Sequence, residues 1–178
     1  MATFHSDLAL KEISDEEWEV IKPLKYSGKS DTFTVPSEFR TDLASVPRAL
    51  TWFVPRYGRY TKAAVLHDFL CRNPDQASRE DADGIFRRTM RELDVSILRR
   101  WIMWAAVRLG NPKALLRSGP VQVLLVLAWA IPALAFLLVP TLVVAVWLTA
   151  AYLLEGVVFV LQWIARKQPN TPSWGIKG

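Results

Sequence analysis

The sequence has a single cysteine, Cys71, which excludes an intrachain disulfide. Its first residues contain neither a basic stretch nor an apolar run, so the N-terminus does not resemble a secretory signal. Neither internal repeats nor low-complexity tracts occur. Residues 1–118 hold 19 Lys and Arg against 16 Asp and Glu, and this small, scattered excess does not predict a nucleic-acid partner.

The last third of the chain lacks charge. Residues 121–165 contain one charged side chain, Glu155, among long apolar runs. A single helix of this length would extend about 68 Å, more than twice the hydrocarbon core of a bilayer. Pro140 lies near the middle and disfavours helical geometry in the residue before it. The pattern therefore predicts a transmembrane hairpin within residues 119–166, with helices over about 121–139 and 141–165 and a polar tail over 167–178.

Basic residues flank this apolar segment on both sides, and the turn between its halves carries no charge. The residues concerned are Arg108, Lys113 and Arg117 before it, and Arg166, Lys167 and Lys177 after it. The positive-inside tendency then predicts a multi-pass protein of the bacterial inner membrane with both termini in the cytoplasm. A helical hairpin buried in a soluble protein and a wedge in one leaflet are the alternatives.

Residues 1–118 predict a soluble α+β domain with a small antiparallel sheet and about three helices. Strands are expected at Leu8–Ile13, Trp18–Tyr26 and Thr32–Val35, where apolar and β-compatible residues are frequent. Pro36 and Pro47 bracket a stretch that is expected to be a rigid loop.

The helices are expected after this loop. The first covers Tyr60–Cys71, and Ser78 is placed to cap the second. A third is expected from Ser96 through Leu109. It carries two tryptophans and several arginines, which suit either contact with lipid headgroups or an ordinary core helix with arginines in solvent.

Three groups of polar residues could carry chemistry. Asp42, Ser45 and Arg48 lie in the stretch Thr41-Asp42-Leu43-Ala44-Ser45-Val46-Pro47-Arg48. His67 and Asp68 follow the apolar stretch Ala63-Ala64-Val65-Leu66. Arg79 and Asp83 are four residues apart and therefore share one helix face.

These motifs, together with Phe33-Thr34-Val35-Pro36, resemble the signature of domain-of-unknown-function family 1353 over residues 33–109. The resemblance implies a phage or prophage gene context and no established activity. Two residues depart from the family pattern. Glu38 stands where the family has glycine, which predicts that a glycine-type backbone angle is not essential there. Cys71 replaces a tyrosine often found after the histidine-aspartate pair.

The polar residues allow three interpretations. His67 beside carboxylates can act as a general base, with Asp42, His67 and Asp68 as candidate catalytic residues and Ser45, Arg48, Arg79 and Asp83 as candidate binding residues. His67 and Asp68 could instead take part in binding a divalent metal, although neighbouring helical residues point about 100° apart. In the third interpretation the same residues form a buried polar network.

The favoured hypothesis is a membrane-anchored, phage- or prophage-related protein that is not an enzyme and assists virion assembly or lysis. Its expected partners are the lipid bilayer, a second copy bound through the hairpin, or phage structural proteins. The alternative is a membrane-tethered hydrolase, metal-dependent or acid/base, built around Asp42, His67 and Asp68.

Overall fold

The computed structural model describes residues 3–44, 46 and 50–165. The chain divides after Leu134 into two compact units. The first contains all the strands, four helices and the beginning of a fifth, and the second consists of the rest of that fifth helix as far as it is described.

The predicted α+β fold is confirmed, but the single expected sheet is wrong. Two antiparallel three-stranded sheets are present, with orders β1-β4-β5 and β2-β3-β6. The bounds are Thr3–Phe4 (β1), Leu10–Glu12 (β2), Trp18–Val20 (β3), Leu24–Ser27 (β4), Thr32–Val35 (β5) and Arg40–Thr41 (β6). The stretch expected as one strand from Trp18 to Tyr26 splits at Pro23, which has no N–H to donate to a ladder. Its two halves join different sheets.

The three predicted helices are confirmed as α1 (Thr61–Arg72), α2 (Arg79–Glu92) and α3 (Ile97–Leu109). The backbone N–H of Asp81 donates to Ser78 Oγ at 3.1 Å, so Ser78 caps α2 as predicted. A short helix, α4 (Pro112–Arg117), follows α3. The connection between them is Gly110-Asn111, and α3 ends at Leu109 as predicted.

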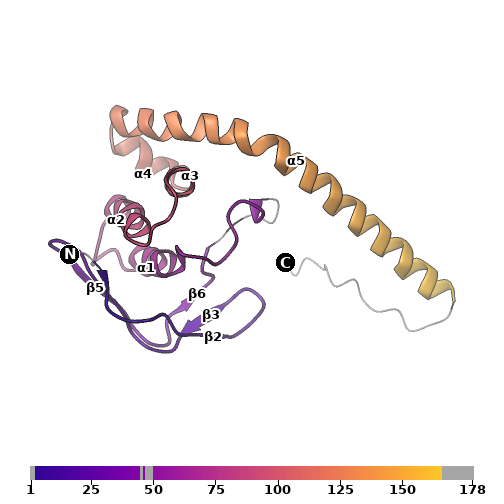
Figure 1. Cartoon of the computed structure of the whole chain (residues 1–178), viewed down its shortest axis with the longest axis horizontal. Coiled ribbons are helices and arrows are strands. Elements are labelled where there is room, and N and C mark those ends of the chain that lie inside the picture. Colours follow the sequence, from indigo (N-terminus) through magenta and orange to yellow (C-terminus); the bar gives the residue numbers. More distant parts are fainter. Residues whose placement is uncertain (1–2, 45, 47–49, 166–178) are drawn as a thin grey trace. The chain divides into compact units, whose positions relative to one another are not determined.

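In the first unit α1, α2, α3 and α4 pack in succession, with α1 nearest the sheets (Figure 1). One core lies between the strands and the helices α1 and α2, where Tyr26, Val35, Leu66 and Leu70 are fully buried. A second core, around Tyr60 and Met90, joins α1, α2 and α3. Because α1 and α2 contribute to both cores, the polar side chains between them are held by packing on two sides.

The backbone at Glu38 differs from its sequence-based prediction. Its φ is +65°, in the left-handed region that glycine adopts without steric cost. The tight turn is fixed by two hydrogen bonds, from Glu38 N–H to the Val20 carbonyl (2.7 Å) and from Val20 N–H to the Phe39 carbonyl (2.9 Å). The glycine-type angle is therefore required even though the residue is glutamate, and the prediction that it is not essential is wrong.

The C-terminal apolar segment is one continuous helix, α5 (Pro120–Ile164), where the sequence predicts two. The helix runs through Pro140, and the predicted break is absent. Proline removes one backbone hydrogen bond and crowds the preceding turn. In a long apolar helix the flanking turns retain their own bonds, and such prolines are tolerated in membrane-spanning helices.

The beginning of α5, as far as Leu134, belongs to the first unit and packs against α3 and α4. Val126 and Ala133 are buried, and Val126 packs with Trp104, Ala105 and Leu115 of α3 and α4. The indole of Trp129 stacks on that of Trp101, with ring centroids 5.0 Å apart and planes 5° from parallel. The opposite face of this section is apolar and exposed, with Val121, Leu124, Leu125, Leu127, Ile131 and Leu134.

Candidate functional site

Asp83 of α2 is the centre of the main polar cluster. Its side chain is only 1% exposed, and three basic groups surround it. His67 Nε2 of α1 lies 2.8 Å from Asp83 Oδ1, Arg79 Nε lies 3.8 Å from the same oxygen, and Arg108 of α3 places a guanidinium nitrogen 3.7 Å from Oδ2. A carboxylate removed from water needs such compensation, because an isolated buried charge is strongly unfavourable.

Arg108 is almost as buried as Asp83, with its side chain 4% exposed. It also donates a hydrogen bond of 3.2 Å to Glu80 Oε1 at the rim of the cluster. Arg108 is therefore buried inside the first unit, which is neither of the two positions that the sequence suggested for the arginines of this helix, contact with lipid headgroups or exposure to solvent. Its position could have been read from α3, because Trp101, Trp104, Ala105 and Arg108 follow the i, i+3, i+4, i+7 spacing of a buried stripe.

His67 contacts Asp83 and Cys71 through the same ring nitrogen. Cys71 Sγ lies 3.4 Å from His67 Nε2, the atom that also faces Asp83. In a catalytic triad the nucleophile contacts one ring nitrogen of the histidine and the orienting carboxylate contacts the other. Here Cys71 and Asp83 contact the same nitrogen, so the three residues do not form a triad. Burial also raises the pKa of the Cys71 thiol to about 11. The thiol is therefore held in its unreactive form at neutral pH.

Asp68, the next residue of α1, has hydrogen-bonding partners different from those of His67. Its carboxylate accepts from Arg72 at 3.0 Å, and Arg72 also donates to the Arg40 carbonyl at 2.9 Å. Burial raises the pKa of Asp68, whereas Arg72 and a hydrogen bond from Thr41 lower it, and the nearby charge of Asp42 raises it further. The charge of His67 also lowers the pKa of Asp68, so both Asp42 and His67 act on Asp68, although the hydrogen-bonding partners of His67 and Asp68 differ.

The loop that carries Asp42 is strained at the next residue. Leu43 has φ +65°, although a leucine side chain is buried there, and its N–H donates to Thr41 Oγ1 at 3.0 Å. Strain of this kind persists only where the surrounding structure fixes it. Ser45 and Arg48, the two binding candidates of this loop, lie outside the described residues.

The separation of His67 from Asp68 bears on the predicted metal site. Asp68 is engaged by Arg72, and His67 by Asp83. Among residues 3–44, 46 and 50–165, no group of three or more His, Cys, Asp or Glu side chains is arranged so that it could hold a metal ion. The described part of the chain therefore adds no support to the hypothesis that His67 and Asp68 bind a divalent metal.

The profile of the family described as "Protein of unknown function (DUF1353)" matches residues 18–107, just over half of the chain. The chain belongs to this family. The match begins at β3, earlier than the resemblance seen in the motifs, and it includes Asp42, His67, Asp68 and Asp83. No curated protein and no solved structure shows significant similarity to the chain.

Helix α5 lies outside the DUF1353 match, as does Arg108, the residue immediately after it. The DUF1353 part supplies the two sheets from β3 onwards and the helices α1 and α2 in full. The cluster around Asp83 is therefore completed by a residue at the end of α3, just beyond the matched residues.

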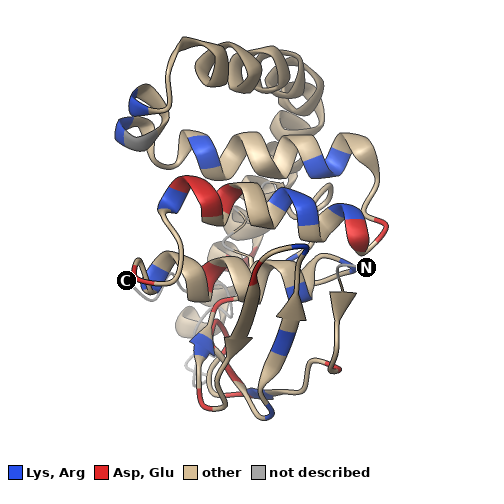
Figure 2. Cartoon of the chain, turned by 90° about the vertical axis from the view of Figure 1, so that its left-hand side faces the viewer, with Lys and Arg blue, Asp and Glu red and all other residues tan. Residues whose placement is uncertain are grey.

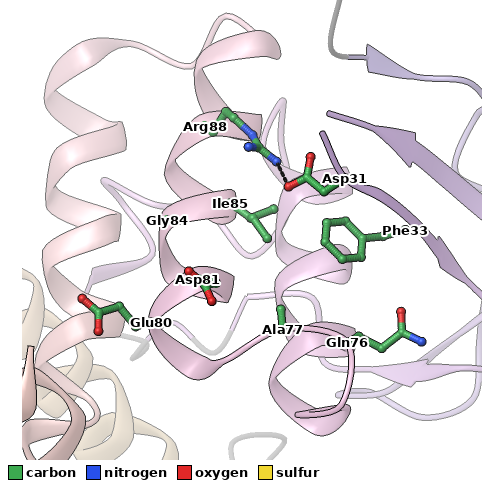
Figure 3. A pocket seen from close by; sticks show the side chains of 9 residues that line it. All are labelled: Asp31, Phe33, Gln76, Ala77, Glu80, Asp81, Gly84, Ile85 and Arg88. Carbon is green, nitrogen blue, oxygen red and sulfur yellow. Dashed lines mark hydrogen bonds and ion pairs between the residues drawn. The ribbon is translucent and has the colours of Figure 1, made fainter. Parts of the chain in front are cut away.

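A second polar network, which the sequence did not indicate, joins α2 to the strands. Arg88 pairs with Asp31 at 2.6 Å and donates to Tyr26 Oη, which itself donates to Glu92 at 2.9 Å. Burial raises the pKa of Tyr26 to about 12. The Arg88–Asp31 pair closes one end of a shallow pocket of about 400 Å³ (Figure 3). Asp42, His67, Asp68 and Asp83 do not line this pocket.

Proposed function

We propose that this DUF1353 protein is a membrane-anchored, non-enzymatic component in which α5 holds the family domain at a lipid surface. The observation that carries the proposal is the exposed apolar surface of α5. Its most apolar window has a mean hydropathy of 2.5 and is only 11% buried. An apolar surface of this extent is typical of a membrane or protein interaction site.

The energetics favour lipid around the second part of α5. Residues 135–164 would extend about 45 Å, which exceeds the roughly 30 Å core and permits one tilted span. Each Leu, Ile, Phe or Val at the centre of a span contributes roughly −0.3 to −0.6 kcal/mol, and a carboxylate such as that of Glu155 costs about 3 kcal/mol. The apolar residues of this segment outweigh that single cost.

We favour one span over the two-helix hairpin because α5 is continuous through Pro140 and because its first section already packs against α3 and α4. Basic residues at both ends of the segment favour the hairpin with both termini in the cytoplasm. The two topologies differ in the side of the membrane on which the C-terminus lies.

The buried cluster supports the non-enzymatic part of the proposal. Asp83 is matched by His67, Arg79 and Arg108, so its charge is compensated inside the protein. The alternative, a hydrolase, has one observation in its favour: the 2.8 Å contact in which Asp83 orients His67. It needs His67, Asp68 and Asp42 to act on one substrate, whereas His67 and Asp68 have separate partners. A role in virion assembly or as a lysis accessory follows from the phage or prophage context of the family resemblance.

The test is fractionation of the full chain expressed in bacteria, followed by alkaline carbonate extraction of the membranes. The wild type is expected to resist extraction. Replacing three exposed α5 residues with arginine (Leu142→Arg, Val146→Arg, Leu153→Arg) is expected to abolish membrane integration. A matched control places three arginines at exposed apolar residues of the family domain and α4 (Ile21→Arg, Tyr57→Arg, Leu116→Arg) and is expected to stay in the membrane. Extraction of the wild type would refute the proposal.

A further inference from the structure

Three arginines on adjacent helices form a basic patch beside the tryptophans of α3. Arg87 and Arg91 lie one turn apart on α2, and Arg100 lies on α3. Figure 2 shows basic residues on both of these neighbouring helices. The Arg87 guanidinium carbon lies 4.5 Å from the ring centroid of Trp101 and 5.0 Å from that of Trp104. These aromatic contacts hold the guanidinium group of Arg87 in place.

Within the described residues, no ion pair joins Arg87, Arg91 or Arg100 to a carboxylate. The other arginines of α2 and α3 that have ion pairs there use Asp31, Asp83 and Glu80, and none of these pairs includes Arg87, Arg91 or Arg100. Burial lowers the pKa of Arg87, and the positive charges of Arg100, Arg91 and Arg108 lower it further. An anion bound at the patch would relieve this repulsion.

The basic patch adjoins the apolar surface of α5. Trp101, which contacts Arg87, stacks on Trp129 of α5. Leu125, one helical turn before Trp129, is 41% exposed and belongs to the exposed apolar face of this section. The guanidinium group of Arg87, the indoles of Trp101 and Trp129 and an exposed apolar side chain of α5 thus follow one another, a combination that suits the boundary between lipid headgroups and acyl chains.

We propose that Arg87, Arg91 and Arg100 bind the phosphate-bearing headgroups of anionic phospholipids. Guanidinium groups donate paired hydrogen bonds to phosphate oxygens, and Trp101 and Trp129 would lie at the level of the acyl-chain boundary. A lipid headgroup fits better than a soluble anion because the patch continues into the apolar face of α5. This inference rests on the proposed anchoring of α5 in a membrane.

The test uses the full chain reconstituted in vesicles of equimolar phosphatidylcholine and phosphatidylglycerol. One of the two lipids carries brominated acyl chains, and quenching of tryptophan fluorescence reports which lipid lies near the indoles. Brominated phosphatidylglycerol is expected to be preferred roughly fivefold or more, the effect of one arginine at an anionic surface. The triple variant Arg87→Gln, Arg91→Gln, Arg100→Gln is expected to lose this preference, as is the wild type at high salt.

Two controls separate local binding from general charge and from loss of folding. Lys11→Gln, Lys22→Gln and Lys29→Gln remove the same charge at exposed positions of the sheet region and are expected to keep the preference. A variant with lysine at all three patch positions keeps the positive charge and is expected to keep most of the preference for phosphatidylglycerol. Equal quenching by both lipids in a wild-type chain that resists carbonate extraction would overturn this inference alone. Carbonate extraction of the wild type would overturn the anchoring as well.

Discussion

Arg108 and Asp83 face each other at 3.7 Å with side chains only 4% and 1% exposed, and they connect α3 to α2 inside the first unit. Replacing one partner of a buried ion pair is costly because the other charge remains without compensation. His67 adds a third element, since its Nε2 contact to Asp83 comes from α1. The cluster therefore ties together the three main helices of the unit.

We predict that Asp83→Asn lowers the free energy of unfolding by about 3–5 kcal/mol, the usual cost of breaking a buried pair. The measurement is chemical denaturation of the full chain in detergent, with the exposed Asp75→Asn as control. The double variant Asp83→Leu with Arg108→Met removes both charges and is expected to recover much of the loss. An Asp83→Asn protein as stable as the control would contradict the structural role of the cluster.

Much of this arrangement can be predicted from the sequence, and some cannot. Ser78 and the apolar face of α2 are local signals, and they locate the helix correctly. His67 and Asp83 are recognisable as polar residues in apolar surroundings. Their pairing with each other is a tertiary contact between α1 and α2, which no local pattern specifies. Arg108 precedes the apolar segment together with Lys113 and Arg117, which suggests a membrane flank, although its helical spacing indicates burial.

Glu38 shows a different limit. A glutamate in place of glycine suggests that the backbone angle is relaxed, but the turn is held by bonds between Glu38 and Val20 that do not involve the side chain. We predict that Glu38→Gly raises the free energy of unfolding by about 0.5–1 kcal/mol, because relief of left-handed strain exceeds the entropy of the added glycine.

The control for this prediction is Glu17→Gly, an exposed residue that is not among the positive-φ residues of the described chain. It is expected to be neutral or destabilising in the same denaturation experiment. If Glu38→Gly is destabilising to the same extent as Glu17→Gly, the left-handed turn is not present in solution.

Cys71 provides a pH-dependent prediction. Burial raises its thiol pKa from 9.0 to about 11. The neutral thiol is favoured in the folded protein, so this contribution to stability is complete below pH 9.0 and is lost as the pH rises towards about 11. Alkylation by iodoacetamide at pH near 8 is expected to be on the order of a hundredfold slower than for unfolded chain, since each pKa unit changes the thiolate fraction tenfold.

The rate of alkylation as a function of pH, followed by mass spectrometry, checks this prediction. Folded protein should react appreciably only in strongly alkaline solution, and denaturant should restore the rate of an ordinary cysteine. Rapid labelling of the folded chain at neutral pH would show that Cys71 is activated by His67, which would favour a catalytic role for that pair.

The topology of α5 gives a further prediction. One span across residues 135–164 places the C-terminus on the opposite side of the membrane from the family domain. Reporter fusions at each terminus of the full chain, one active only in the cytoplasm and one only outside it, distinguish the two sides. Both termini on the cytoplasmic side would favour the two-helix hairpin with a break at Pro140.

The most direct test of membrane anchoring is the environment of residue 147, where Trp147 is 73% exposed on α5. A nitroxide label is introduced by Trp147→Cys in a Cys71→Ser background, and its collisions with oxygen and with a water-soluble nickel chelate are compared in reconstituted vesicles. The account predicts high accessibility to oxygen and low accessibility to nickel at this position, with the reverse at a Lys29→Cys label on the exposed domain surface. Free access of the nickel chelate to residue 147 would contradict it.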